Sequence, residues 1–177
     1  MPPPVPPYLT KPGVGGMQMN IRQNRTRSLV YGAIIAAAYV ALVFLLAPIS
    51  YGALQIRVAD ALVGIVPLVG WPGVVGVTIG VLIGNIPSTL GPLDLLSAIP
   101  TFVALVIVVK LRDRSVMAGL TAYTAIISAW VGYLLALVFQ VPFAITFVYL
   151  FIGIGIATMG MGYLLYKAMK RVLGNGA

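Results

Sequence analysis

Apolar residues dominate the chain from residue 28 onward and fall into six segments. The segments are 28–47, 58–70, 73–88, 94–111, 116–138 and 145–167. A helix needs about 20 apolar residues to cross a hydrocarbon core of ~30 Å. By this measure the first, fifth and sixth segments are long enough, the fourth is adequate, and the second and third are short. The pattern predicts an all-α integral membrane protein with a six-transmembrane-helix bundle, or a re-entrant hairpin over residues 58–88 within that bundle.

The segments before and after this bundle differ in composition from it. Six of the 13 prolines fall within the first 12 residues, where a fixed φ and missing N–H groups favour an extended, unpaired chain. We therefore predict a flexible, Pro-rich, basic cytoplasmic tail over residues 1–27, with Met17 and Met19 as alternative translation starts. The membrane domain spans 28–171, and residues 172–177 form a short C-terminal tail.

Composition narrows the class of function. Hydrophobic residues make up 60% of the chain and charged residues 8%, and the mean hydropathy is +1.06, so lipid rather than water surrounds most of it. With no Cys, no His and three acidic residues, the sequence offers little for nucleophilic catalysis or a metal site. We expect no enzyme, no cofactor held by this chain and, because the cations form short clusters between apolar runs, no nucleic-acid binding.

The cations predict the orientation of the spans. With six spans and a cytoplasmic N-terminus, ten of the eleven fall on the cytoplasmic side, as the positive-inside rule requires. These ten are Lys11, Arg22, Arg25, Arg27, Lys110, Arg112, Arg114, Lys167, Lys170 and Arg171. Only Arg57 falls outside. An even number of spans, with both termini cytoplasmic, follows from this asymmetry.

Small residues recur every four positions on two of the predicted helices. Ala33, Ala37 and Ala41 share one face of the first span, and such a groove lets another backbone approach closely in lipid. The partner of this groove is either another span of the same chain or a second subunit. Three glycines, at 76, 80 and 84, form a comparable groove on the third span, for which we expect internal packing.

The stretch 47–73 contains the unusual charges of the membrane region. Arg57 and Asp60 lie three residues apart, so on a helix they share a face and can pair, and they open a short segment interrupted by Pro67. Charged groups in a membrane are costly and usually face a cavity or a partner. Short, Pro-interrupted segments beside such charge indicate a substrate site in transporters. The alternative is an interfacial ion pair that only starts a helix.

Other polar residues converge on the same side of the membrane. Asn85 ends the third span and Asp94 begins the fourth, and both are also explained as residues that end or cap a helix. In the six-span topology they share the extracellular half with Arg57, Asp60 and Gln140. No matching polar track runs to the cytoplasmic side, which a channel or proton-coupled carrier would need. The pattern favours capture of a solute from outside by a chain without its own source of energy.

Two stretches resemble a known family. They read LVYGAIIAAAYVALVFLLAPISYGALQIRVADALVGIVPL and GVTIGVLIGNIPSTLGPLDLL. They are similar to the queuosine-precursor transporter (QueT) family, which comprises substrate-binding S components of energy-coupling factor (ECF) transporters. The resemblance covers residues 28–114 and is sharpest in API-S-x-GA-x-Q-x-RV-x-[acid]-AL. Two departures are Asp60, where the family usually carries Glu, and the absence of an acidic residue in 152–162.

The resemblance implies a six-helix bundle of the ECF S-component type in a prokaryotic plasma membrane. It implies partners as well: a transmembrane coupling subunit and two ABC-type ATPases that hydrolyse the ATP, since this chain has no Walker motif. The Ala-x-x-x-Ala face formed by residues 33, 37 and 41 then becomes a docking surface for the coupling subunit.

The solute implied by the resemblance is a 7-deazaguanine such as preQ0 or preQ1. Its guanine-like edge donates two adjacent N–H groups, which a carboxylate can accept as a fork. The candidates are Asp60 or Asp94 for that edge, Asn85 and Gln55 for other polar atoms, and Arg57 to orient Asp60 or contact the solute carbonyl. For stacking on the ring the candidates are Tyr51, Trp71 and Trp130. Alternatives are an S component for another vitamin or nucleobase-like solute, and a structural membrane protein without a solute.

Overall fold

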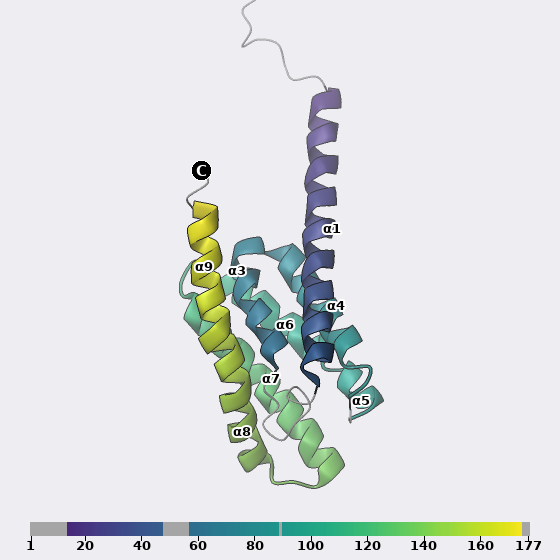
Figure 1. Cartoon of the computed structure of the whole chain (residues 1–177), viewed down its shortest axis with the longest axis vertical. Helices are drawn as coiled ribbons and strands as arrows, with labels where there is room; N and C mark the ends of the chain where they lie inside the picture. Colours follow the sequence, from purple (N-terminus) through teal and green to yellow (C-terminus); the bar gives the residue numbers. More distant parts are fainter. Residues whose placement is uncertain (1–13, 48–56, 89, 175–177) are drawn as a thin grey trace, which may run out of the picture.

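The computed structural model describes residues 14–47, 57–88 and 90–174, and all regular elements in these ranges are helices (Figure 1). In chain order they are α1 (Val14–Leu45), the 3-10 helix η2 (Val58–Ile65), α3 (Val66–Val69), α4 (Trp71–Gly84), α5 (Pro92–Leu95), α6 (Ala98–Leu111), α7 (Val116–Phe139), α8 (Phe143–Gly155), the π-helix η3 (Ile156–Gly162) and α9 (Tyr163–Gly174). The prediction of an all-α fold is confirmed for these ranges.

All six predicted apolar segments are helical, but they differ in length. Within the described ranges, four helical stretches are long and apolar enough to cross a bilayer: Arg25–Leu45, Pro92–Leu111, Val116–Phe139 and Phe143–Val172. The helices Val58–Val69 and Trp71–Gly84 are shorter. A 14-residue α-helix rises only about 21 Å, so neither covers the hydrocarbon core alone.

The first helix begins earlier than the sequence pattern suggested. The expected flexible tail covered residues 1–27, whereas α1 starts at Val14 and continues without a break to Leu45. The last proline of the N-terminal run is Pro12, and the residues after it include Met, Gln and Arg, which favour helices. Hydropathy marks where a helix enters lipid, but not where the helix starts.

Glycines set the contact between α1 and α4, which run side by side in the same direction (Figure 1). A Cβ at Gly76 would lie 2.5 Å from the carbonyl oxygen of Gly32, and one at Gly80 would lie 2.7 Å from Cβ of Tyr39. Gly84 faces Val43. The glycine groove of the third span is therefore filled from within the chain, as expected, because only residues without a side chain permit this approach.

The last apolar segment is one long helix with an irregular middle. The π-helix η3 joins α8 to α9. Short π-helical stretches inside α-helices are frequent at functional sites. The π-helix packs on η2, where a Cβ at Gly64 would overlap the backbone of Gly162. An under-wound helix thus packs directly against an over-wound one, and η2 carries Asp60.

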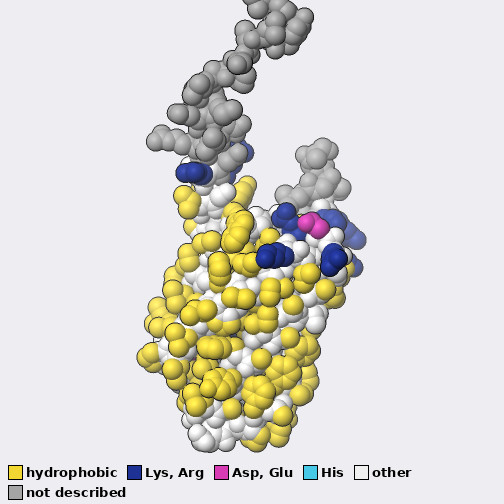
Figure 2. Space-filling model, turned by 180° about the vertical axis from the view of Figure 1, so that it is seen from behind, with side chains coloured by type: hydrophobic (Ala, Val, Ile, Leu, Met, Phe, Trp, Pro, Cys, Tyr) yellow, Lys and Arg dark blue, Asp and Glu magenta, His cyan; other side chains and the backbone are white. Residues whose placement is uncertain are grey.

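The charged side chains divide the molecule into a basic end and an apolar body (Figure 2). The side chains at the basic end are exposed: Arg25, Arg27, Lys110, Arg112, Arg114, Lys167, Lys170 and Arg171. The N-terminal half of α1 and the end of α9 reach this same end (Figure 1). Arg57, Asp60 and Asp94 are instead buried.

Candidate substrate-binding site

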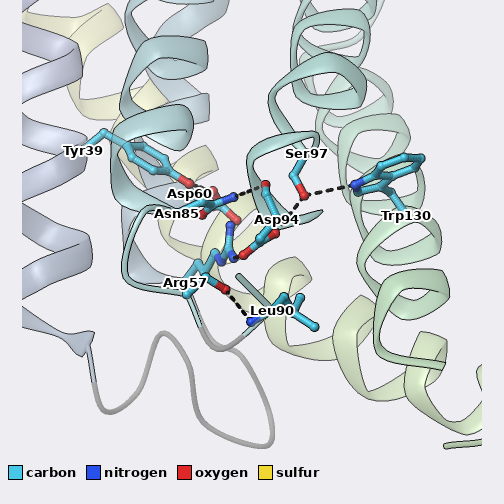
Figure 3. A network of polar contacts seen from close by, with 9 residues as sticks. Tyr39, Arg57, Asp60, Asn85, Leu90, Asp94, Ser97 and Trp130 are labelled. Carbon is cyan, nitrogen blue, oxygen red and sulfur yellow. Dashed lines mark hydrogen bonds and ion pairs between the residues drawn. The ribbon is translucent and has the colours of Figure 1, made fainter. Parts of the chain in front are cut away.

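The buried charged residues meet where several helices start or end. Asp60 lies in the first turn of η2, with Arg57 directly before this helix. Asn85 ends α4, and Asp94 lies in the first turn of α5. Gly70, directly after α3, lies beside the side chain of Arg112 and therefore at the basic end of the molecule. The four site positions lie at the other ends of their helices, away from the basic end. Helix termini far apart in sequence therefore bring four predicted site residues together (Figure 3).

Arg57 and Asp94 form an ion pair in the interior. Nη2 of Arg57 donates to Oδ2 of Asp94 over 3.3 Å, and the two side chains are 5% and 0% exposed. The sequence spacing suggested a pair between Arg57 and Asp60 instead. That expectation assumed one continuous helix, but Arg57 has φ −80° and ψ 89°, outside the helical region, so its side chain points across the site to Asp94.

Each carboxylate oxygen of Asp94 accepts a hydrogen bond within the cluster. Its second carboxylate oxygen, Oδ1, accepts from Oγ of Ser97 at 2.8 Å, and Ser97 Oγ in turn accepts from Nε1 of Trp130 at 3.0 Å. The backbone oxygen of Asp94 accepts from Nδ2 of Asn85 at 2.9 Å. Charge-assisted hydrogen bonds of this kind fix a buried carboxylate. Asp94 therefore joins α4, α5 and α7 into one rigid unit.

Asp60 has a different environment. Its Oδ1 accepts from the hydroxyl of Tyr39 at 2.7 Å and from the hydroxyl of Tyr123 at 3.4 Å. Its other oxygen, Oδ2, is buried and has no hydrogen-bond partner within the described part of the chain. A buried acceptor without a donor is costly, and in native proteins such an atom is generally satisfied by a water, an ion or another bound group. The structure thus separates the two candidate carboxylates: among the described residues Oδ2 of Asp60 has no donor, whereas each carboxylate oxygen of Asp94 has one.

The other predicted site residues have three outcomes. Trp130 is half-buried and contacts the cluster through Ser97, with its indole N–H engaged. Gln140 ends α7 exposed, with φ 56°, and donates to the Leu137 carbonyl, so it is not in the cluster. Trp71 is the first residue of α4, and its side chain is 59% exposed. This end of α4 lies near Gly32 and away from the cluster. Tyr51 and Gln55 lie outside the described residues.

Sequence reasoning missed three members of the cluster, namely Tyr39, Tyr123 and Ser97. Both tyrosines are almost completely buried, and each lies well inside an apolar span. A tyrosine hydroxyl in lipid needs an acceptor, so a mid-span tyrosine is a usable signal. The signal for Ser97 is its spacing of three residues from Asp94.

The predicted alanine face lies on the outside of the bundle. Ala33, Ala37 and Ala41 are exposed and line a groove of about 870 Å³ between α1 and α4. The opposite wall is apolar and is formed by Trp71, Val75, Ile79 and Ile83 of α4. The sequence left two candidates for the partner of this face, another span of the same chain or a second subunit. Among the described residues, no span of this chain fills the groove.

A helical membrane bundle that buries an ion pair and an unpaired carboxylate acceptor has the features of a membrane transport protein, because such groups persist in lipid where they meet a solute or partner. The sequence matches the model of the QueT transporter family over residues 29–171. The chain therefore belongs to the QueT transporter family. Comparisons with curated proteins and with solved structures gave no match.

Proposed function

We propose that this protein is the substrate-binding S component of an ECF-type transporter and captures a 7-deazaguanine, a queuosine or archaeosine precursor, from outside the cell. The observation that carries the proposal is Oδ2 of Asp60, a buried acceptor without a donor among the described residues, beside the Arg57–Asp94 pair. Family membership supports a transporter, and the residues of the cluster support a solute that donates N–H groups.

Orientation follows from charge in this proposal. The basic end faces the cytoplasm under the positive-inside rule, so both termini are cytoplasmic in a prokaryotic plasma membrane. The cluster, at the other ends of the helices, then lies on the side that faces the outside. The helices Val58–Val69 and Trp71–Gly84 are short, but both can still count among the six spans. Their outer ends lie at the site, so they need not reach the outer membrane surface.

Asp60 is the better acceptor for the solute. Its Oδ1 is held by two tyrosine hydroxyls, and Oδ2 remains for N–H donors of the ring. Asp94 acts indirectly, because both of its carboxylate oxygens are engaged. A site that places a fixed acceptor in this way can reject analogues lacking the donor, since the acceptor would stay unpaired.

Transport depends on partners in this proposal. The exposed groove over Ala33, Ala37 and Ala41 docks the transmembrane coupling subunit, because small residues admit a helix at close distance. Two ABC-type ATPases bound to that subunit hydrolyse the ATP, and this chain binds no cofactor. The loaded protein is then reoriented through a difference in affinity between two states.

The deciding experiment is identification by mass spectrometry of the small molecule that co-purifies with the protein, followed by titration with 7-deazaguanines. We expect tight binding by the wild type and a large loss in Asp60→Ala. Asp113→Ala is the matched control, because this carboxylate is 87% exposed at the basic end. Retained affinity in Asp60→Ala would contradict the site, and a different co-purified solute would favour an S component for another vitamin or nucleobase.

A further inference from the structure

A polar recess lies at the basic end of the bundle, at the opposite end from the buried charged cluster. Its volume is about 390 Å³, within the range of about 300–1,000 Å³ that is usual for small-molecule sites. Three parts of the chain line it, namely α3, the segment from the end of α6 to the start of α7, and α9. The lining residues are Pro67, Leu68, Arg112, Asp113, Val116, Tyr166 and Lys170.

The recess follows from the short second span. The helix η2 has eight residues and α3 has four. A rise of about 2.0 Å per residue in a 3-10 helix and 1.5 Å in an α-helix gives about 22 Å in all, less than a hydrocarbon core of ~30 Å. The neighbouring helix α9 continues past the level of α3 (Figure 1). Water or lipid headgroup atoms therefore have to fill the space beside Pro67 and Leu68.

Two basic side chains from different elements line the recess. Arg112 ends α6, and Lys170 lies on α9, with Nζ 5.7 Å from the centre of the Tyr166 ring, a distance at which a cation and a ring attract each other. These two cations are among those that gather at the basic end (Figure 2). Their positions on opposite sides of one recess allow both to contact the same small anion.

The acidic residue of the lining offsets these cations only in part. Oδ1 of Asp113 lies 3.7 Å from Nε of Arg112, and the Asp113 side chain is 87% exposed. Exposed ion pairs of this length contribute little, so an anion in the recess can compete for the guanidinium. Two positive side chains and one negative side chain leave the lining with a net charge of +1, to which the start of α7 at Val116 adds a partial positive charge.

We propose that this recess binds the phosphate group of an anionic phospholipid. A guanidinium can donate to two phosphate oxygens at once, and a Lys ammonium attracts phosphate as a point charge. A phosphodiester with a charge of −1 matches the net charge of the lining. The inference is independent of the transported solute.

The apolar part of the lining favours a lipid over a free phosphate ion. Leu68 and Tyr166 are half-buried, so an acyl chain can lie against them while the headgroup contacts Arg112 and Lys170. Tyrosines are also enriched at the depth of the headgroups. Basic pockets between transmembrane helices at the cytoplasmic side are known to bind anionic headgroups.

The test compares phosphatidylglycerol with phosphatidylcholine of the same short acyl chains, because the two lipids share the phosphodiester and differ in net charge. Wild-type protein in detergent is titrated with each by calorimetry. We expect phosphatidylglycerol to bind at least about tenfold more tightly, since each basic residue near an anionic lipid contributes about fivefold. A third arm adds excess sodium phosphate at an ionic strength matched with sodium chloride, and it should not displace the lipid.

Two double variants with the same net charge assign the preference to the recess. In Arg112→Gln/Lys170→Gln the preference for phosphatidylglycerol should fall to about twofold or less. The matched control is Arg114→Gln/Lys167→Gln, which removes two exposed cations of the basic end that do not line the recess, and it should keep a preference of at least about fivefold. All four side chains are exposed, so both variants should melt at the wild-type temperature without lipid.

Three outcomes would overturn the inference. An equal loss of preference in the two double variants would show that the overall charge of the basic end attracts the lipid, without a site in the recess. Displacement of the lipid by sodium phosphate would identify a free phosphate ion as the ligand. If Arg112→Gln/Lys170→Gln kept the lipid preference but lost uptake into cells, the recess would bind an acidic protein partner instead.

Discussion

The two faces of α1 show two ways in which a membrane helix makes contacts. On the inner face, Tyr39 packs on Gly80 and donates to Asp60. On the outer face, Ala33, Ala37 and Ala41 line an open apolar groove. The inner contacts require paired polar groups, because neither lipid nor the protein interior offers a new hydrogen-bond partner when one is lost. The outer face requires small side chains, which let another helix approach closely.

The comparison suggests that binding and docking are separable by mutation although they share one helix. Tyr39 and Ala37 are two residues apart and point in nearly opposite directions on an α-helix. A change on the inner face should alter stability and solute affinity. A change on the outer face should alter only the interaction with a partner.

The largest expected effect is on the inner side. Arg57→Ala leaves Asp94 buried without its ion-pair partner, at 0% exposure, and breaking such a pair typically costs about 3–5 kcal/mol. We expect a large loss of thermal stability, measured in detergent by the melting temperature. In the double variant Arg57→Met/Asp94→Leu, which removes both charges, much of this loss should be recovered. An Arg57→Ala protein as stable as the wild type would contradict a structural role for the pair.

A smaller effect is expected where α4 approaches α1. Gly80→Ala places a Cβ 2.7 Å from Cβ of Tyr39, and overpacking of this kind costs about 1–3 kcal/mol. The displaced tyrosine should also weaken solute binding through Asp60. The matched control is Gly160→Ala, where a Cβ would have no heavy atom within 4 Å. Equal melting temperatures for the two variants would argue against the close α1–α4 contact.

The outer face is tested by Ala37→Leu. The larger side chain fills the groove, so uptake into cells should fall at least about tenfold, equivalent to 1.4 kcal/mol, while solute affinity of the purified protein stays unchanged. Ala144→Leu, at an exposed alanine of α8, should leave uptake normal. Normal uptake by Ala37→Leu would refute docking through this groove.

The smallest effect is expected for Trp130→Phe, which removes one hydrogen bond to Ser97. A single neutral hydrogen bond contributes about 0.5–1.5 kcal/mol. Thermal unfolding should show a modest decrease, and less for Trp71→Phe, because Trp71 is 59% exposed. The reverse order would show that Trp130 does not support the position of Ser97 and Asp94.

Much of the architecture is predictable from the pattern of apolar residues. All six apolar segments are helical, and the basic residues gather at one end. The internal packing of Gly76, Gly80 and Gly84 was also predictable, because small residues every four positions make a groove on any helix. The start of α1 was not, since helix formation between Val14 and Arg27 does not depend on hydropathy.

The candidate site is predictable only in part. Arg57, Asp60, Asn85 and Asp94 were recognisable as charged or polar groups in an apolar context, which is a local property of the sequence. Which of these residues pair with one another was not recognisable from the sequence. The backbone at Arg57 leaves the helical region, and this turns the guanidinium to Asp94 rather than to the nearer residue in sequence.

By itself the sequence determined that this is a helical membrane protein, which end is basic, and which few charges lie within the lipid-embedded region. Those facts follow from composition and spacing. The tertiary structure decided that Arg57 pairs with Asp94, that Tyr39 and Tyr123 donate to Asp60, and that one oxygen of Asp60 has no donor among the described residues. The reason is that a buried charge is satisfied by whichever group the fold brings within reach, and that distance is not encoded in position along the chain.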